Sequence, residues 1–212
     1  MDERLTELTI RSLLERLASS DPVPGGGSAS ALAGAMGAAL VHMVVELTVD
    51  RPAAAGQEEA LSGIRTAADW WQSELLDLAE LDAKAYAAVV VARRLPKESE
   101  LEREARAAEL AAAIREAIRV PLATAKAASE VLELAGRLAP IGNRNAISDV
   151  GVAALLAVTA VRGAALNVEI NLSSVTADEE LRGESASEIE RLLAGLDERE
   201  RTVRDAVAER LR

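Results

Sequence analysis

The 212 residues include 24 Lys and Arg against 35 Asp and Glu, and the formal net charge of −11 excludes the usual electrostatic attraction to nucleic acid. The chain has no Cys and a single His, which excludes disulfides and thiolate metal sites and leaves little for zinc, so we expect no metal. Half of the residues are hydrophobic but only 1% are aromatic, so the core must consist mainly of small aliphatic side chains on closely packed helices.

Apolar residues recur at helical spacing along nearly the whole chain, and no segment has the alternation of a strand. We expect Ser28 to cap the second helix and Pro121 to kink or restart the fourth. The predicted fold is an all-α, single-domain bundle of long helices over residues 1–212. The predicted helices cover residues 3–18, 28–49, 57–93, 99–138, 146–171 and 185–212.

Two Ser–Glu pairs at capping-box spacing mark further helix starts. Ser99 and Glu102 open the fourth predicted helix, and Ser185 and Glu188 open the C-terminal one. The tail at 178–212 is more charged than the rest, so we expect a C-terminal helical arm that packs on a partner subunit.

One segment has the composition of a membrane helix. Ala29–Val45 contains no Asp, Glu, Lys or Arg, but it is slightly short for a span, is diluted by Gly and Ser, and lacks basic flanks. We therefore expect a buried central helix. Because the charged N-terminal segment is no signal peptide either, we expect a cytoplasmic protein without a membrane partner.

Asp82 is the clearest candidate for chemistry. It occupies a position in the apolar stripe of the third helix where a hydrophobic residue is expected. A carboxylate in such a place is costly to bury unless it is paired, and its pKa is often shifted. The alternative is a structural Asp bonded to a neighbouring helix.

A run of three glycines precedes the second helix. Gly25, Gly26 and Gly27 would let the backbone approach a ligand, and the helix that follows would direct its free N–H groups toward it. A flexible, helix-breaking turn explains the run equally well, and the spacing is not that of a dinucleotide-binding motif.

Polar residues also stand at the start and near the end of the fifth helix. Asp149 lies in its first turn, where an acid favours the helix dipole without any ligand. Asn167 and Asn171, four residues apart, share one face among apolar neighbours and need partners from another helix or from a polar ligand.

Taken in order, these segments resemble the formiminotransferase-cyclodeaminase C-terminal family, which includes stand-alone methenyltetrahydrofolate cyclohydrolases. The likeness covers nearly the whole chain, with Tyr86 standing where Phe is common. The segments that carry it are Pro24–Ser28, Asp82–Tyr86, Arg94–Lys97, Val120–Leu122, Gly142–Asn143, Ser148–Asp149 and Gly163–Leu172.

The resemblance implies a cyclohydrolase-like helical bundle that forms a homodimer, with a reduced-folate site near the subunit interface and no cofactor beyond the tetrahydrofolate substrate. It assigns Asp82 as the catalytic carboxylate. The residues expected to bind the substrate are Gly25, Gly26, Gly27, Ser28, Arg94, Lys97, Asn143, Ser148, Asp149, Asn167 and Asn171.

Two reactions fit the expected site. A cyclohydrolase adds water to 5,10-methenyltetrahydrofolate and yields 10-formyltetrahydrofolate; a cyclodeaminase closes 5-formiminotetrahydrofolate and expels ammonia. We favour the cyclohydrolase slightly, since no transferase domain precedes the chain. A dimeric helical scaffold without catalysis, and a folate-binding protein that has lost turnover, are the non-enzymatic alternatives.

Overall fold

The computed structural model describes residues 4–175 and 178–212, and this part of the chain folds into helices without a strand, as the all-α prediction requires. Short 3₁₀ helices are η1 (Leu5–Glu7), η2 (Pro52–Ala54) and η3 (Arg144–Ala146). The α-helices are α1 (Ile10–Leu17), α2 (Gly26–Val49), α3 (Glu58–Arg93), α4 (Glu100–Leu138), α5 (Ile147–Leu172), α6 (Glu179–Leu193) and α7 (Leu196–Leu211).

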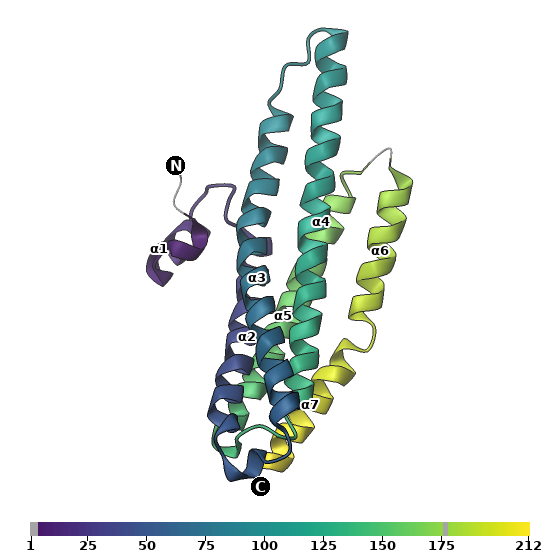
Figure 1. The fold of residues 1–212 in the computed structure, drawn as a ribbon. Helices are drawn as coiled ribbons and strands as arrows, with labels where there is room; N and C mark the ends of the chain where they lie inside the picture. The colour runs from purple at the N-terminus through teal and green to yellow at the C-terminus, as the bar shows by residue number, and fades with distance from the viewer. Residues whose placement is uncertain (1–3, 176–177) are drawn as a thin grey trace.

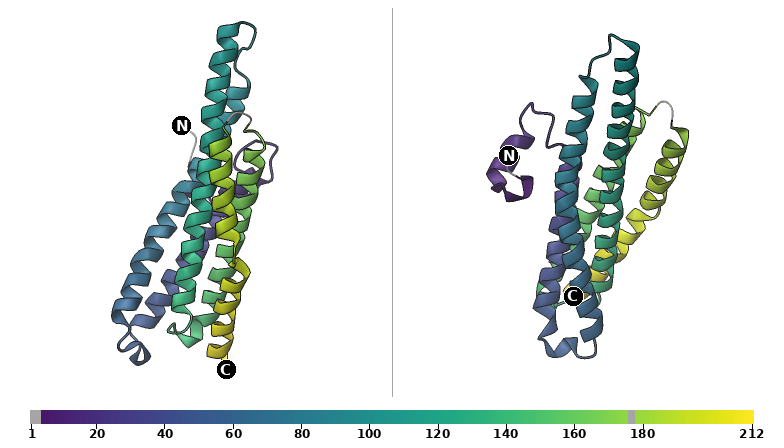
Figure 2. Two further views of the ribbon diagram at one scale, coloured as in Figure 1. Left: turned by 90° about the vertical axis from the view of Figure 1, so that its right-hand side faces the viewer. Right: turned by 45° about the horizontal axis from the view of Figure 1, so that its top comes forward.

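Helices α2 to α5 form the central bundle, in which α2 packs on α3 and α5, and α4 packs on the same two helices. The long helices α3 and α4 continue past the start of α2 as a hairpin, at the top of Figure 1 and from two further sides in Figure 2. Small aliphatic side chains fill the core, as the composition predicts. On α2 the fully buried ones are Ala31, Ala38, Val41, Val44 and Val45.

Two helices are long and apolar enough to cross a membrane by length and composition. They are Gly26–Val49 and Arg144–Leu172, and the bundle buries 50% and 44% of their most apolar windows. The first contains the segment that we expected to be a buried central helix. Core helices of a bundle are equally long and apolar, so length and composition do not distinguish a buried helix from a membrane-spanning one.

The N-terminal prediction of one helix over residues 3–18 is wrong within the described part; residue 3 lies outside it. The segment is divided into η1 and α1, because Thr9 is extended and caps α1 by accepting a 3.1 Å hydrogen bond from the Ser12 N–H. Glu80 of α3 holds η1, since its Oε1 accepts from the backbone N–H and the hydroxyl of Thr6 at 2.9 and 3.0 Å. Helix α1 has no buried residue and stands apart from the bundle (Figure 1).

The C-terminal prediction also needs correction. Ser185 is buried inside α6, which starts earlier, at Glu179. Its N-cap is Asp178, whose Oδ1 accepts from the Leu181 N–H at 3.0 Å. The single predicted helix is broken at Gly195, where φ is +68°, a left-handed conformation that only glycine adopts cheaply. Both α6 and α7 pack on α4 and α5 of their own chain, and the predicted contact of this arm with a partner subunit stays a prediction.

The remaining boundaries lie within a few residues of the predicted ones. The Ser99–Glu102 capping box is present, and it starts α4 as predicted. Pro121 lies inside α4 and does not restart it. The predicted capping of α2 by Ser28 is wrong, because α2 already begins at Gly26 with Gly25 as its N-cap.

Candidate active site

A cavity of about 250 Å³ opens where the first turn of α2 meets the middle of α3 and the C-terminal part of α5. In Figure 1 this region lies at the base of the α3–α4 hairpin. Six of the predicted site residues line the cavity: Gly25, Gly26, Gly27, Asp82, Asn167 and Asn171. Its other lining residues are Pro22, Val23, Tyr86, Ala117 and Ile170.

The Asp82 carboxylate lies directly against the backbone of Gly27. A Cβ atom on Gly27 would stand 2.1 Å from Oδ1, 2.5 Å from Cγ and 2.7 Å from Oδ2 of Asp82. Ordinary contact starts at about 3.4 Å, so no residue with a side chain fits at this position while the carboxylate stays where it is. The second possibility raised for the glycine run, a merely flexible turn, does not describe Gly27, which lies within α2.

Ser28 holds the carboxylate from the same turn of α2. Its buried Oγ lies 2.9 Å from Asp82 Oδ2 and 3.0 Å from the carbonyl oxygen of Ala79, one turn earlier on α3. A hydroxyl has one proton to donate, so these two acceptors share it. This contact, rather than capping, is what Ser28 contributes.

Burial raises the pKa of Asp82 above its ordinary value of 3.8, and the hydrogen bonds from the Ser28 side chain and backbone oppose that rise without cancelling it. Desolvation penalises the charged form of an acid, and no cation in the described part of the chain compensates for it. The half-buried Asp82 is therefore an acid that holds its proton more tightly than a surface Asp. Such a group, in a cavity, is suited to proton transfer.

Two amides of α5 border the same cavity. Asn167 Nδ2 donates to the Gly163 carbonyl at 2.8 Å, and Asn171 Nδ2 donates to the Ala117 carbonyl of α4 at 2.7 Å. In the described part of the chain neither Oδ1 atom takes a hydrogen bond, so each can accept one from a ligand. The partners that these two amides need are therefore backbone carbonyl oxygens, which accept from the Nδ2 atoms. The Oδ1 atoms remain available to a ligand.

Comparison with known proteins gives these residues a context. The family model described as formiminotransferase-cyclodeaminase matches residues 9–191. The chain belongs to the formiminotransferase-cyclodeaminase family.

Among relatives in this family, a methenyltetrahydrofolate cyclohydrolase of Methylorubrum extorquens is 42% identical over 186 residues, which are 88% of this chain and 89% of the relative. A formimidoyltransferase-cyclodeaminase of Mus musculus is 34% identical over 84% of this chain, and the aligned part is 33% of that longer protein. The crystal structure of formiminotetrahydrofolate cyclodeaminase from Thermotoga maritima superposes with a TM-score of 0.86 at 28% identity, covering 97% of this chain and 98% of that one.

Two residues of the family motifs lie at the tip of the α3–α4 hairpin. Arg94 is the C-cap of α3, and it and Lys97 are exposed. At 1.5 Å per residue, Arg94 lies about 18 Å along the helix axis from Asp82. Neither residue lines the Asp82 cavity, and their assignment to the substrate stays a prediction.

Three further family-motif residues lie at the opposite end of the bundle. The buried Asn143 joins the α4–α5 turn to the end of α2, because its backbone N–H donates to Thr48 Oγ1 at 2.9 Å and its Nδ2 donates to the Leu47 carbonyl at 2.8 Å. Ser148 and Asp149 lie in the first turn of α5. Within one chain these three are separated from Asp82 by most of the length of α2, and their role at a substrate stays a prediction.

The cavity is also lined by residues that we did not predict from the sequence: Tyr86, Ile170 and the Pro22–Val23 pair. Tyr86 follows Asp82 by four residues, and that spacing on a helix puts both on one face, which was a usable signal. Ile170 is 68% exposed, so the cavity opens to solvent beside an apolar side chain. The Pro22–Val23 pair precedes the glycine run and carried no such pattern.

Proposed function

We propose that this protein is a methenyltetrahydrofolate cyclohydrolase. The proposal rests on one observation: a desolvated Asp82 carboxyl group, held by Ser28 against Gly27, borders an open cavity. The relative of similar length bearing this activity in its name is 42% identical, compared with 34% for the mouse bifunctional protein, and this favours the cyclohydrolase over the cyclodeaminase.

In the proposed reaction Asp82 transfers a proton between water and a folate nitrogen. As water attacks the methenyl carbon of the cationic substrate, the ionised carboxylate takes one of its protons and a tetrahedral carbinol forms. The carbinol hydroxyl then loses its proton to solvent as the carbon–N5 bond breaks, and Asp82 returns its proton to N5. The products are 10-formyltetrahydrofolate and one released proton, so atoms and charge balance.

The contacts of Ser28 suit an acid that changes charge during turnover. When Asp82 is ionised, the Ser28 hydroxyl donates to it; when Asp82 is protonated, the hydroxyl donates to the Ala79 carbonyl and accepts from the acid. Neither state leaves a buried polar group unpaired. The carboxylate also opposes the positive charge of the substrate and stabilises it electrostatically. We propose that neither a metal nor an additional cofactor takes part.

The alternative reaction, formiminotetrahydrofolate cyclodeamination, uses the same groups. N10 attacks the formimino carbon of the substrate, and the N10 proton passes to the formimino nitrogen. A protonated Asp82 then donates a second proton to the departing amine, and ammonia leaves as the methenyl cation forms. The crystallised Thermotoga maritima protein named for this activity has the same fold, which supports this second candidate.

We also propose that the protein acts as a homodimer. Large apolar side chains on α2 and on α5, two helices packed side by side, remain exposed. On each helix their spacing keeps them on one side, and contiguous apolar surface of this kind marks an interface. The residues are Met36, Met43 and Leu47 of α2 and Val152, Leu155, Leu166 and Ile170 of α5.

Because Ile170 also lines the Asp82 cavity, a second copy on this face would border the substrate. Light scattering after size exclusion should give twice the chain mass for the wild type and a shift toward the single-chain mass for Leu155→Glu. A wild type that is monomeric at every concentration would remove the dimer from the proposal.

The test of the reaction offers each substrate separately to the purified protein. Loss of methenyl absorbance reports the cyclohydrolase, and ammonia release reports the cyclodeaminase. Asp82→Asn should keep the fold and lose at least about a hundredfold in kcat, the low end for a positioned proton-transfer group. Asp77→Asn, on the exposed side of α3 in an ion pair with Arg4, is the matched control and should keep normal turnover. Near-normal turnover of Asp82→Asn would remove this carboxylate from the mechanism.

A further inference from the structure

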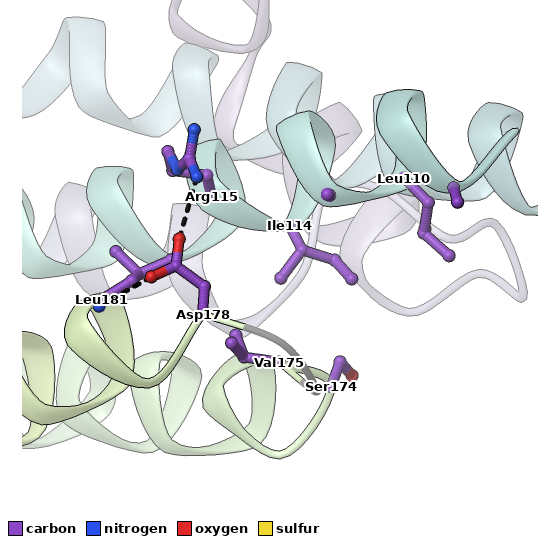
Figure 3. Close-up of a pocket in the computed structure, with 9 residues that line it drawn as sticks. Leu110, Ile114, Arg115, Ser174, Val175, Asp178 and Leu181 are labelled. Carbon is purple, nitrogen blue, oxygen red and sulfur yellow. Dashed lines mark hydrogen bonds and ion pairs between the residues drawn. The ribbon is translucent and has the colours of Figure 1, made fainter. Parts of the chain in front are cut away.

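A second cavity follows the Asp82 cavity along α4 and the end of α5. It measures about 210 Å³ and is lined by α4, by Ser174 and Val175 after α5, and by Asp178 and Leu181 at the start of α6. Figure 3 shows Leu110, Ile114 and Val175 around it, with Arg115 and Asp178 facing each other at one end. Nothing in the proposed reaction uses this cavity.

The two cavities share the same helix faces. On α4, Ala107, Leu110 and Ile114 line the second cavity and Ala117 lines the first, with steps of three, four and three residues that keep them in one stripe. In the same way, Asn171 at the end of α5 lines the first cavity, and Ser174, three residues later, lines the second. Adjacent turns of the same two elements therefore border the two cavities.

The size of the first cavity requires a continuation. A site that encloses a drug-sized ligand usually has about 300–1,000 Å³, so about 250 Å³ holds only part of a folate. The proposed reaction places the one-carbon atom between N5 and N10 beside Asp82. The aminobenzoyl ring and the glutamate then have to extend out of that cavity.

Charge in and around the second cavity suits the carboxylate end of such a ligand. The Arg115 side chain is 59% exposed, and among the described residues one of its guanidinium nitrogens is engaged, at 2.8 Å from Asp178 Oδ2. The Arg182 guanidinium donates to the carbonyl of Val175, a lining residue, and makes no ion pair in the described part of the chain. One arginine thus lines the cavity and a second contacts a lining residue, while Asp178 is the one carboxylate among the lining residues, in a protein whose net charge is −11. The acidic Glu179 and Glu180 are exposed and do not line the cavity.

We propose that this second cavity is the subsite for the aminobenzoyl-glutamate part of the folate, and that Arg115 binds the glutamate carboxylates. The ring packs on Leu110, Ile114 and Val175, and the free donors of Arg115 form charge-assisted hydrogen bonds to the glutamate. The inference rests on the proposed folate function, and it assigns the glutamate to Arg115 rather than to Arg94 or Lys97 at the hairpin tip.

The experiment compares 5,10-methenyltetrahydrofolate with the analogue that lacks glutamate, 5,10-methenyltetrahydropteroate. Arg115→Ala should raise the KM for the folate roughly tenfold, leave its kcat unchanged and leave the KM for the pteroate unchanged. Arg119→Ala, one turn along α4 in an exposed pair with Glu116, is the matched control and should match the wild type with both substrates.

A second variant separates binding from structure. Asp178→Asn breaks the same ion pair but keeps the cation and an acceptable helix cap, so the KM for the folate should stay the same or fall. A purely structural ion pair would instead make Arg115→Ala and Asp178→Asn lose thermal stability and affinity together, for both substrates.

The outcomes distinguish the two proposals. If the wild type turns over neither folate substrate and binds neither, the proposed function and this inference both fail. If it turns over folate and pteroate with equal KM, or if Arg94→Ala raises the KM for the folate and Arg115→Ala does not, the reaction stands and the subsite assignment is overturned.

Discussion

Gly27→Ala is the sharpest test of the site geometry, because it adds a single methyl group where the Asp82 carboxylate now lies. The new Cβ would stand 2.1 Å from Oδ1, and ordinary contact begins at 3.4 Å, so the carboxylate must retreat by about 1.3 Å. The Asp82 side chain is short and can rotate, so the clash displaces the carboxylate and leaves the helices in place.

The expected effect on catalysis is large and the effect on folding is small. A misplacement of about 1 Å can cost about a hundredfold in rate, so we expect kcat to fall by about that factor. Ala gains up to about 1 kcal/mol over Gly in a helix, while losing the Ser28–Asp82 hydrogen bond costs about 1.5–3 kcal/mol when the acid is charged. The net change in unfolding free energy should therefore stay within about 2 kcal/mol.

The adjacent glycine supplies the control. A Cβ on Gly26 would meet Asn167 Nδ2 at 3.5 Å, an ordinary contact, so Gly26→Ala leaves the Asp82 carboxylate in place and should lose less kcat than Gly27→Ala. Both variants are assayed by loss of methenyl absorbance and by thermal unfolding followed with circular dichroism. If Gly27→Ala retained wild-type kcat while remaining folded, the position of the Asp82 carboxylate would not matter for the reaction, and the argument from close approach would be refuted.

Three further predictions concern stability. Because burial raises the pKa of Asp82, the folded protein should lose stability as pH rises from the ordinary value of 3.8 through the folded pKa. In urea unfolding, the stability of Asp82→Asn relative to the wild type should therefore be greater at neutral pH than at acid pH. A pH-independent difference would contradict this. Gly195→Ala places Ala at φ +68° and should lower the free energy of unfolding by about 1 kcal/mol. Gly183→Ala lies inside α6, where the new Cβ would meet nothing within 4 Å, and should raise it by up to about 1 kcal/mol. Equal effects of the two substitutions would contradict the left-handed turn at Gly195. Hydrogen bonds from Arg191 are the main cause that lowers the pKa of Glu188 to about 2. The stability that ionised Glu188 contributes should therefore be present above about pH 4.5 and lost as pH falls toward 2. Glu188→Gln should lack this pH-dependent stability, and identical acid unfolding curves for variant and wild type would contradict the prediction.

The helical period of apolar residues was enough to predict an all-α fold and the extents of α3, α4 and α5. Those helices are long, and each repeats its pattern over many turns, so local signals accumulate. The short ends of the chain did not follow the same reasoning. Glu80, far along the sequence, holds η1, and the left-handed Gly195 divides the last predicted helix; neither interaction leaves a periodic trace.

The candidate site, too, was predictable from the sequence only in part. Asp82 was identifiable from sequence because a carboxylate interrupts an apolar stripe, and the glycine run because it is a rare composition. The sequence did not show that Gly27 and Asp82 touch across two helices, or that Asn143 instead joins the far end of α2 to the α4–α5 turn.

By itself, then, the sequence determined the helices, the acid that stands out of its stripe and the family to which the motifs point, because each is written in neighbouring residues. Only the tertiary structure decided which polar residues meet in a cavity, how closely the carboxylate approaches α2, and that a second cavity lies at Arg115. Those properties depend on how the helices are rotated and offset against one another, and packing between residues far apart in the chain sets both.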